Sequence, residues 1–166
     1  MADLAASVKA LQAEVTSWKA SGQTVVFTNG VFDVLHVGHV VVLQAAAAEG
    51  DRLVVGINSD ASVRGLGKGA DRPIHPESDR ATLLAALRSV DAVVVFDAPT
   101  PLEIIETLRP DVVVKGGDYR ADVTDPSDPA YIVGSREVAT WGGRAVAVPL
   151  VPGKSTTATL ARIRKA

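Results

Sequence analysis

Two histidines, His36 and His39, stand three residues apart, shortly after a β-branched run that ends in Asn29-Gly30. This order predicts a buried strand, a tight turn and a helix whose first turn carries both imidazoles on one face. The start of a helix offers unpaired N–H groups and positive dipole potential, so anionic oxygens bind there readily. Two imidazoles at such a place can stabilise charge that develops on a phosphate. The sequence therefore predicts that His36 and His39 are catalytic residues.

A metal site is the alternative for this pair, because histidines at i and i+3 of a helix can bind zinc. Such a site needs a third ligand, and only His75 or loop carboxylates could provide it. Gly38 favours the nucleotide interpretation, because it removes the side chain that would keep a base or ribose away from the helix backbone.

The turn between the strand and the helix presents backbone N–H groups that can hold phosphate oxygens, although Asn-Gly is also simply a favoured turn. Its predicted nucleotide-binding residues are Thr28, Asn29, Gly30, Val31 and Phe32. Asp33 could bind magnesium or a substrate hydroxyl. Asn58 and Asp60 follow the second predicted strand, where a substrate contact and a plain polar turn fit equally well.

Lys115 ends the fourth predicted strand and is followed by Gly116, Gly117 and Asp118. We expect its ammonium over the phosphates, with the two glycines allowing close approach of the backbone. The alternative is a lysine that extends from the sheet edge before a glycine turn.

The run Gly153–Thr157 is similar to the end of a phosphate-binding P-loop. That motif needs a glycine where Val148 stands, so it is excluded. What remains is a helix start with three hydroxyls, those of Ser155, Thr156 and Thr157, which suit a pyrophosphate or an ordinary helix cap. A dinucleotide fingerprint is also excluded, because the glycines of 65–69 have the wrong spacing.

These residues must be positioned by alternating strands and helices. Strands are expected at 24–28, 52–57, 92–96, 111–115 and 144–150, and helices at 4–20, 37–49, 77–89, 101–108, 135–141 and 156–165. Short Val-rich strands separated by helices indicate a doubly wound α/β fold, with a parallel five-stranded sheet between two helical layers. Such folds bind ligands at the carboxyl ends of the strands. The connecting segments 58–76, 116–134 and 151–155 should lie at that edge.

Composition limits the function classes. The 166 residues suit one domain, with an N-terminal helix in 1–22 and a catalytic core in 24–165. A net charge of −2 argues against nucleic acid as a partner. The sequence contains no cysteine, no signal peptide and no apolar run long enough to span a membrane. Together these features predict a soluble cytoplasmic protein. Helix 4–20 and the Val-rich edges could support a homodimer.

Together these motifs resemble the heptose 1-phosphate adenylyltransferase family of the nucleotidyltransferase superfamily. The matching pieces are Thr-Asn-Gly-Val-Phe-Asp, His-Val-Gly-His, Asn-Ser-Asp-Ala-Ser, Arg72-Pro73, Lys-Gly-Gly-Asp-Tyr and Ser-Thr-Thr. The resemblance implies a Rossmann-like fold and transfer of AMP from ATP, with Mg²⁺, to D-glycero-β-D-manno-heptose 1-phosphate. It implies that the histidines, Lys115 and Ser155–Thr157 contact ATP. The residues expected to face the sugar phosphate are Asp33, Asn58, Asp60, Lys68, Arg80, Gly116, Gly117 and Asp118.

Two departures bear on specificity. Related cytidylyltransferases carry Arg-Thr-Glu-Gly before the final Ser-Thr, whereas this chain has Leu150-Val151-Pro152-Gly153, which favours ATP over CTP. The connection 120–134 is longer than in the family and is expected at the substrate edge. Many relatives are fused to a sugar kinase, so we expect a separate kinase here. The alternatives are a cytidylyltransferase acting on a polyol or amino-alcohol phosphate and a non-catalytic adenine-nucleotide-binding module.

Overall fold

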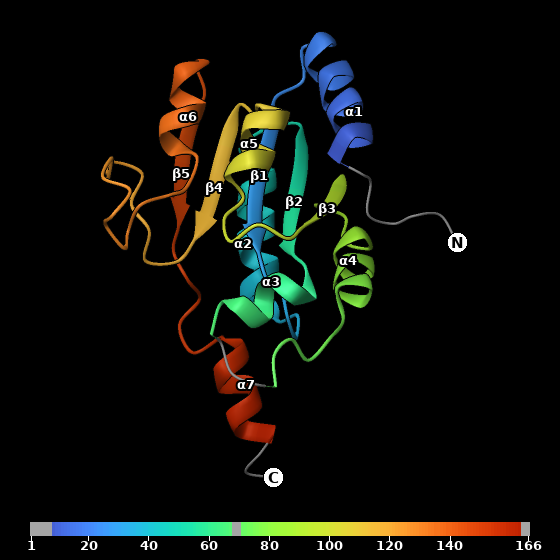
Figure 1. Ribbon diagram of the computed structural model, residues 1–166, viewed down its shortest axis with the longest axis vertical. Coiled ribbons are helices and arrows are strands. Elements are labelled where there is room, and N and C mark those ends of the chain that lie inside the picture. The colour runs from blue at the N-terminus through green and yellow to red at the C-terminus, as the bar shows by residue number, and fades with distance from the viewer. Residues whose placement is uncertain (1–7, 68–70, 164–166) are drawn as a thin grey trace.

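The computed structural model describes residues 8–67 and 71–163. Its five strands form one parallel sheet in the order β3-β2-β1-β4-β5 (Figure 1). The elements, in chain order, are α1 (Val8–Ala20), β1 (Val25–Gly30), α2 (Val37–Ala47), β2 (Arg52–Asn58), α3 (Asp60–Gly65), α4 (Glu77–Ala85), β3 (Ala92–Phe96), α5 (Leu102–Leu108), β4 (Val112–Gly116), α6 (Ser135–Thr140), β5 (Arg144–Val148) and α7 (Thr156–Ile163).

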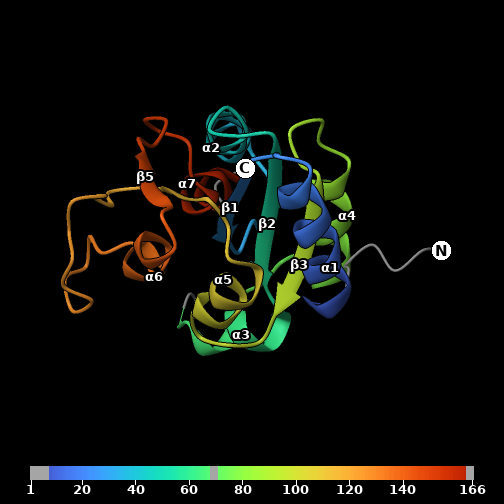
Figure 2. The ribbon, with the colours of Figure 1, turned by 90° about the horizontal axis from the view of Figure 1, so that it is seen from above.

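Helices cover both faces of the sheet, as Figure 2 shows from above. On one face Val26 of β1 packs in a cluster with Leu43 of α2 and Leu84 of α4. On the other face Phe27, the next residue of β1, packs with residues of α1, α5 and α6. Successive side chains of a strand point to opposite faces, so a strand buried on both sides must be apolar throughout. The predicted doubly wound, three-layer α/β fold is confirmed.

The chain reverses its direction across the sheet beside β1. It runs outward from β1 through β2 to β3, then returns to place β4 on the other side of β1. The helices that follow β1 and β4 therefore diverge, and a crevice opens at the carboxyl ends of these two strands. Asn29 near the end of β1 and Lys115 near the end of β4 lie at this switch point.

The strand predictions agree with the structure to within two residues at each end, and the described helices other than α3 lie inside the predicted ranges. Helix α3 was missed, because the sequence analysis treated 58–76 as a connection. It is only six residues long, and Val63 is its one buried residue. An element this short has too few apolar residues to show a helical period in the sequence. The main local indication of a helix is the N-cap residue Ser59, whose Oγ accepts from the Ser62 N–H at 3.1 Å.

The long connection 120–134 is held together by its own polar groups. The Arg120 N–H donates to the Ala130 carbonyl at 2.9 Å, and the Asp125 carboxylate accepts from both the N–H and the hydroxyl of Ser127. Its base is anchored by Ile132, which is buried. Figure 1 shows the tip of this loop projecting beside α6, away from α3. Among the described helices, none is long and apolar enough to cross a bilayer.

Candidate active site

Two adjoining cavities lie at the carboxyl ends of the central strands. The first, of about 320 Å³, lies between β1, β4, the start of α2 and the segment 150–156; its lining residues are Thr28, Asn29, Gly30, Val31, Phe32, His36, Gly38, His39, Val42, Lys115, Gly116, Tyr119, Leu150, Lys154, Ser155 and Thr156. The second, of about 300 Å³, is lined by Asn29, Gly30, Val31, Asn58, Leu66, Pro99, Thr100, Pro101, Lys115, Tyr119 and Val133. The two cavities therefore share a wall, which is formed by Lys115 and by the turn that follows β1.

The two imidazoles stack on each other at the start of α2. Their ring centres are 3.8 Å apart and their planes differ by 20°. His36 is the N-cap residue, and its backbone N–H donates to Nδ1 of His39 at 3.3 Å. Because Nδ1 of His39 accepts a hydrogen bond, we assign the proton of its neutral ring to Nε2. That leaves Nε2–H of His39 as a donor for a ligand in the first cavity.

Burial keeps both rings neutral near pH 7. It lowers the pKa of His39 to about 4, with a further decrease from His36 and an opposing effect from the Asp33 carboxylate. Burial also lowers the pKa of His36. A neutral imidazole still donates one hydrogen bond, and polyanionic phosphates beside it favour protonation. The pair can therefore respond to negative charge that enters the cavity.

Gly38 is required by the packing of the site itself. A Cβ at this position would stand 2.9 Å from Cε1 of His36 and 3.3 Å from the Lys154 carbonyl oxygen. The sequence analysis expected this space to admit a base or a ribose. In the structure the His36 ring and the Lys154 carbonyl lie where that Cβ would stand, so Gly38 also allows the segment before α7 to approach the start of α2. Gly38 lines the first cavity, and its contact with a nucleotide stays a prediction.

Lys115 lies on the wall between the two cavities. Its Nζ donates to the backbone carbonyl of Asn29 at 3.1 Å and to Oδ1 of Asn29 at 3.0 Å. The ammonium also lies over the Tyr119 ring, 5.5 Å from its centre. These contacts hold a positive charge at the switch point, within reach of anions bound on either side.

Two of the three hydroxyls predicted at the start of the last helix line the first cavity: that of Ser155, just before α7, and that of Thr156, its first residue. The Ser155 oxygen accepts from the Ala158 N–H at 3.1 Å, which caps the helix. The Thr156 hydroxyl donates to the Asp33 carbonyl at 2.8 Å. Thr157 is exposed and lies outside the lining of both cavities.

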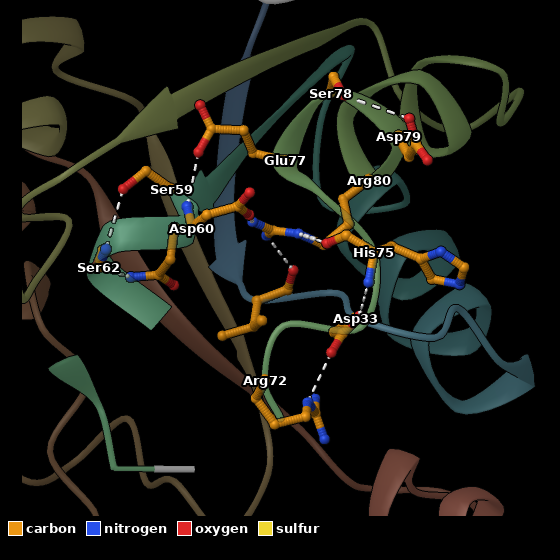
Figure 3. Close-up of polar contacts among 12 residues, drawn as sticks. Asp33, Ser59, Asp60, Ser62, Arg72, His75, Glu77, Ser78, Asp79 and Arg80 are labelled. Atoms are coloured by element: carbon orange, nitrogen blue, oxygen red, sulfur yellow. Dashed lines mark hydrogen bonds and ion pairs between the residues drawn. The ribbon is translucent and has the colours of Figure 1, made fainter. Parts of the chain in front are cut away.

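The turn after β1 has an unusual backbone. Phe32 and Val34 have φ values of 51° and 54°, and a β-branched residue with positive φ is rare. Asp33, which lies between them and is 1% exposed, accepts three hydrogen bonds. Nε of Arg72 donates at 2.6 Å and the His75 N–H at 3.0 Å (Figure 3), and the Ile74 N–H donates at 2.8 Å. Burial opposes ionisation of Asp33, but these donors and the Arg72 charge outweigh it and lower its pKa.

Arg80 supports the same turn through buried hydrogen bonds. Its side chain is fully buried and donates to the Val31 carbonyl at 2.8 Å, the His75 carbonyl at 3.0 Å and Oδ1 of Asp60 at 2.8 Å (Figure 3). Asp33, Asp60 and Arg80 are absent from the described lining of both cavities. The structure therefore favours a positioning role for these three residues over the predicted contact with a sugar phosphate.

The other predicted substrate residues are dispersed. Asn58 lines the second cavity and donates to the Ser62 hydroxyl at 3.0 Å, whereas Gly116 lines the first. Gly117 bonds through its N–H to the Val148 carbonyl, and Asp118 is exposed. Lys68 lies outside the described residues.

The sequence analysis missed several lining residues, namely Val42, Leu66, Pro99, Thr100, Pro101, Tyr119, Val133, Leu150 and Lys154. The segment 99–101 follows β3, so the rule that ligands bind at strand carboxyl ends could have found it. Val133 is the one residue of the loop 120–134 in the described lining of these cavities.

The zinc alternative for the histidine pair finds no support. Within residues 8–67 and 71–163, no group of three or more His, Cys, Asp or Glu side chains could hold a metal ion. The described lining of the first cavity also includes no carboxylate. A divalent ion at this place would therefore be bound mainly by the oxygens of the phosphates it accompanies.

Comparison with known proteins agrees with this geometry. Residues 27–159 match the family model described as cytidylyltransferase-like. The chain is 53% identical over 147 residues to the bifunctional protein HldE of Acidiphilium cryptum and 56% identical over 142 residues to that of Syntrophotalea carbinolica. These matches cover 89% and 86% of this chain but only 28% and 27% of the relatives, so the chain spans less than a third of their length.

A solved structure supports the same assignment. The lipopolysaccharide core biosynthesis protein from Thermoplasma volcanium superposes with a TM-score of 0.59 at 28% identity, over 78% of this chain and 98% of that one. The predicted nucleotidyltransferase superfamily thus agrees with the family match. The chain belongs to the cytidylyltransferase-like family and is a nucleotidyltransferase.

Proposed function

We propose that the protein transfers AMP from ATP to a sugar 1-phosphate, most specifically D-glycero-β-D-manno-heptose 1-phosphate, and releases pyrophosphate and ADP-heptose. The observation that carries this proposal is the pair of adjoining cavities with Lys115 on their common wall and the histidine pair in one of them. Two phosphate-bearing substrates could then meet at one cluster of donors.

The first cavity suits ATP. His36, His39, Lys115 and Lys154 line it, and the start of α7 adds the hydroxyls of Ser155 and Thr156. All of these groups can donate to phosphate oxygens, while Val42 and Leu150 provide apolar surface for a base. Mg²⁺ would enter with the triphosphate and neutralise charge on the leaving pyrophosphate.

The second cavity suits the sugar phosphate. Asn58 and Thr100 offer hydrogen bonds to hydroxyls, and Lys115 offers a charge to the phosphate end. In the reaction, an oxygen of the sugar phosphate attacks the α-phosphorus of ATP, and the bond from that phosphorus to the pyrophosphate oxygen breaks. The attacking oxygen is already ionised, so a general base is unnecessary. Catalysis then rests on alignment and on donors such as Nε2–H of His39.

The identity of the two substrates is supported by particular residues. Lys115–Tyr119 and Ser155–Thr157 match motifs of the heptose 1-phosphate adenylyltransferases, and Leu150–Gly153 replaces the sequence typical of cytidylyltransferases. The relatives named HldE and the lipopolysaccharide core biosynthesis protein are consistent with this substrate. The acceptor requires a sugar kinase activity that acts before this step.

A pyrophosphate-release panel tests the proposal. ATP and CTP are each combined with heptose 1-phosphate, a hexose 1-phosphate and glycerol phosphate at matched concentrations. We expect the highest kcat/KM for ATP with heptose 1-phosphate, because buried polar groups left unpaired by the wrong partner cost much of the rate. Preference for CTP with glycerol phosphate would overturn the assignment. Binding of ATP without pyrophosphate release from any pair would indicate a non-catalytic module.

A further inference from the structure

The side chain of Asn58 lies at the carboxyl end of β2, where it lines the second cavity. Asn58 is 5% exposed, so this carboxamide has almost no contact with solvent except through the cavity. A carboxamide has two different ends, because its nitrogen only donates hydrogen bonds and its oxygen only accepts them. The end that faces the cavity therefore decides which ligand atoms can bind there.

The hydroxyl of Ser62 fixes the orientation of this carboxamide. Ser62 lies in the first turn of α3, and its hydroxyl donates its single proton to the Ala98 carbonyl at 3.2 Å. Towards Asn58 the Ser62 oxygen can then only accept, and it accepts from Nδ2 of Asn58 at 3.0 Å. The amide nitrogen therefore faces Ser62, and the amide oxygen, Oδ1, points away from it.

Oδ1 of Asn58 is available to a ligand. Within the described part of the chain no N–H or O–H pairs with this oxygen, and it is not one of the fully buried side-chain atoms that lack a partner. It is therefore open to the cavity, where it can accept a hydrogen bond. The apolar lining residues Leu66, Pro99 and Pro101 have no polar side-chain group that could compete for the same ligand atom.

The other side of the second cavity is positively charged. Lys115 of β4 lines it, and in the sheet only β1 separates β4 from β2. Neighbouring strands lie about 4.8 Å apart, so the ends of β2 and β4 are about 10 Å apart. An acceptor oxygen on one side and an ammonium on the other suit a ligand that carries hydroxyls at one end and a phosphate at the other.

We infer that Ser62 is a positioning residue for recognition of the acceptor. It orients the Asn58 carboxamide so that Oδ1 accepts from a hydroxyl of the sugar, while the phosphate lies on the Lys115 side. An ionised phosphate has no proton to donate, so it is disfavoured at Oδ1. The carboxamide thus sets the direction in which the sugar phosphate lies across the cavity. This inference rests on the proposed function, because it takes the second cavity as the sugar phosphate site.

A double-mutant cycle tests the inference through equilibrium binding of D-glycero-β-D-manno-heptose 1-phosphate. We expect Asn58→Ala to weaken binding about ten-fold, because it removes one buried hydrogen bond, and Ser62→Ala to weaken it several-fold. The double variant should bind like Asn58→Ala, because Ser62 acts only through Asn58. The Kd of ATP should be almost unchanged in all three variants, since neither residue belongs to the described lining of the first cavity.

Ser59→Ala is the matched control on the same helix. Oγ of Ser59 caps α3 by accepting from the Ser62 N–H at 3.1 Å (Figure 3), whereas the Asn58 carboxamide bonds to Ser62 instead. Ser59→Ala should therefore lower the Tm, as loss of a helix cap does, and leave the Kd of heptose 1-phosphate almost unchanged. If Ser59→Ala weakened binding as much as Ser62→Ala, the stability of α3 would explain the effect and the inference would be overturned.

The side-chain amide protons of Asn58 provide a measurement that needs no ligand. Their NMR signals are assigned by their absence from the spectrum of Asn58→Ala. In Ser62→Ala we expect one of the two signals to move upfield, because that proton loses its acceptor. Unchanged amide signals, or a double variant in which the two losses multiply, would overturn the inference. A wild-type chain that does not bind heptose 1-phosphate would overturn the proposed acceptor, and the amide signals would still decide whether Ser62 orients Asn58.

Discussion

The Thr156 hydroxyl donates to the backbone carbonyl of Asp33 at 2.8 Å, across 123 residues of sequence. This contact ties the start of α7 to the turn after β1, in which Phe32 and Val34 have positive φ values. Through this bond a side chain of α7 holds the turn in place. The shape of the first cavity therefore depends on an element none of whose described residues is buried.

Thr156→Val tests this connection, because it keeps the shape of the side chain and removes the donor. We expect a loss of about 1 kcal/mol in the free energy of unfolding and a several-fold higher KM for ATP. Thr157→Val is the control, since Thr157 lines neither cavity, and its KM should stay within two-fold of wild type. Steady-state kinetics and urea unfolding provide both values. Equal behaviour of the two variants would contradict a role for the Thr156–Asp33 bond.

His39→Ala should reduce turnover far more than ATP affinity. Nε2–H of His39 is a donor on the first cavity, and loss of one well-placed donor to a transition state typically costs about 100- to 1000-fold in rate. His75→Ala is the control, because the structure uses only backbone groups of His75 in the turn. Turnover comes from pyrophosphate release and affinity from equilibrium binding. A His39→Ala enzyme within a few-fold of wild type would remove His39 from the mechanism.

The pKa of His39 predicts how stability depends on pH. This pKa is about 4 in the folded chain, whereas an unperturbed histidine has a pKa of 6.5, so between these values the unfolded chain binds more protons. The free energy of unfolding should therefore fall as pH decreases from about 6.5 towards 4. His39→Gln removes this titration and should flatten the dependence. Urea unfolding at pH 7, 6 and 5 measures it, and identical slopes for both proteins would contradict the effect.

The sheet and the histidine pair were predictable because local patterns specify them. Continuous apolar runs such as Val112–Val114 specify buried parallel strands, and the chain order then places the strand ends together. The hydrogen-bond partners of Asp33 and Arg80 were not predictable from such patterns. Their types and positions near phosphate-binding motifs suggest substrate contacts, whereas their hydrogen bonds depend on where segment 72–75 and α4 pack. Sequence spacing contains no information about that packing.

The loop 120–134 shows the same limit. Its place after β4 predicted a position at the substrate edge, and Val133 does line the second cavity. The tip is turned away because Arg120 bonds to Ala130 and closes the loop on itself. A strand end fixes where a loop begins, but the hydrogen bonds within the loop decide where its tip lies.

Lys115→Met should reduce activity while leaving stability almost unchanged. The substitution keeps an apolar stem and removes the ammonium at the wall between the cavities, so we expect about a 100-fold lower kcat/KM. Lys19→Met is the control, because it removes a lysine ammonium that lies outside the candidate active site. Its ammonium pairs with Asp111 at 2.9 Å before the start of β4, far from both cavities. That variant should keep full activity. Preserved activity and a lower Tm in Lys115→Met would instead assign Lys115 a structural role.

Arg80→Met distinguishes a positioning role from a substrate contact. The guanidinium is fully buried and satisfies Val31, His75 and Asp60, so its loss leaves the Asp60 carboxylate and two carbonyls without a donor. We expect a loss of about 3–5 kcal/mol in the free energy of unfolding, and Arg80→Lys should recover part of it. Arg120→Met is the control, because the Arg120–Asp122 pair is exposed and exposed pairs contribute little. If Arg80 instead contacted the substrate, the Arg80→Met variant would unfold like wild type in urea, and only its KM for the sugar phosphate would rise.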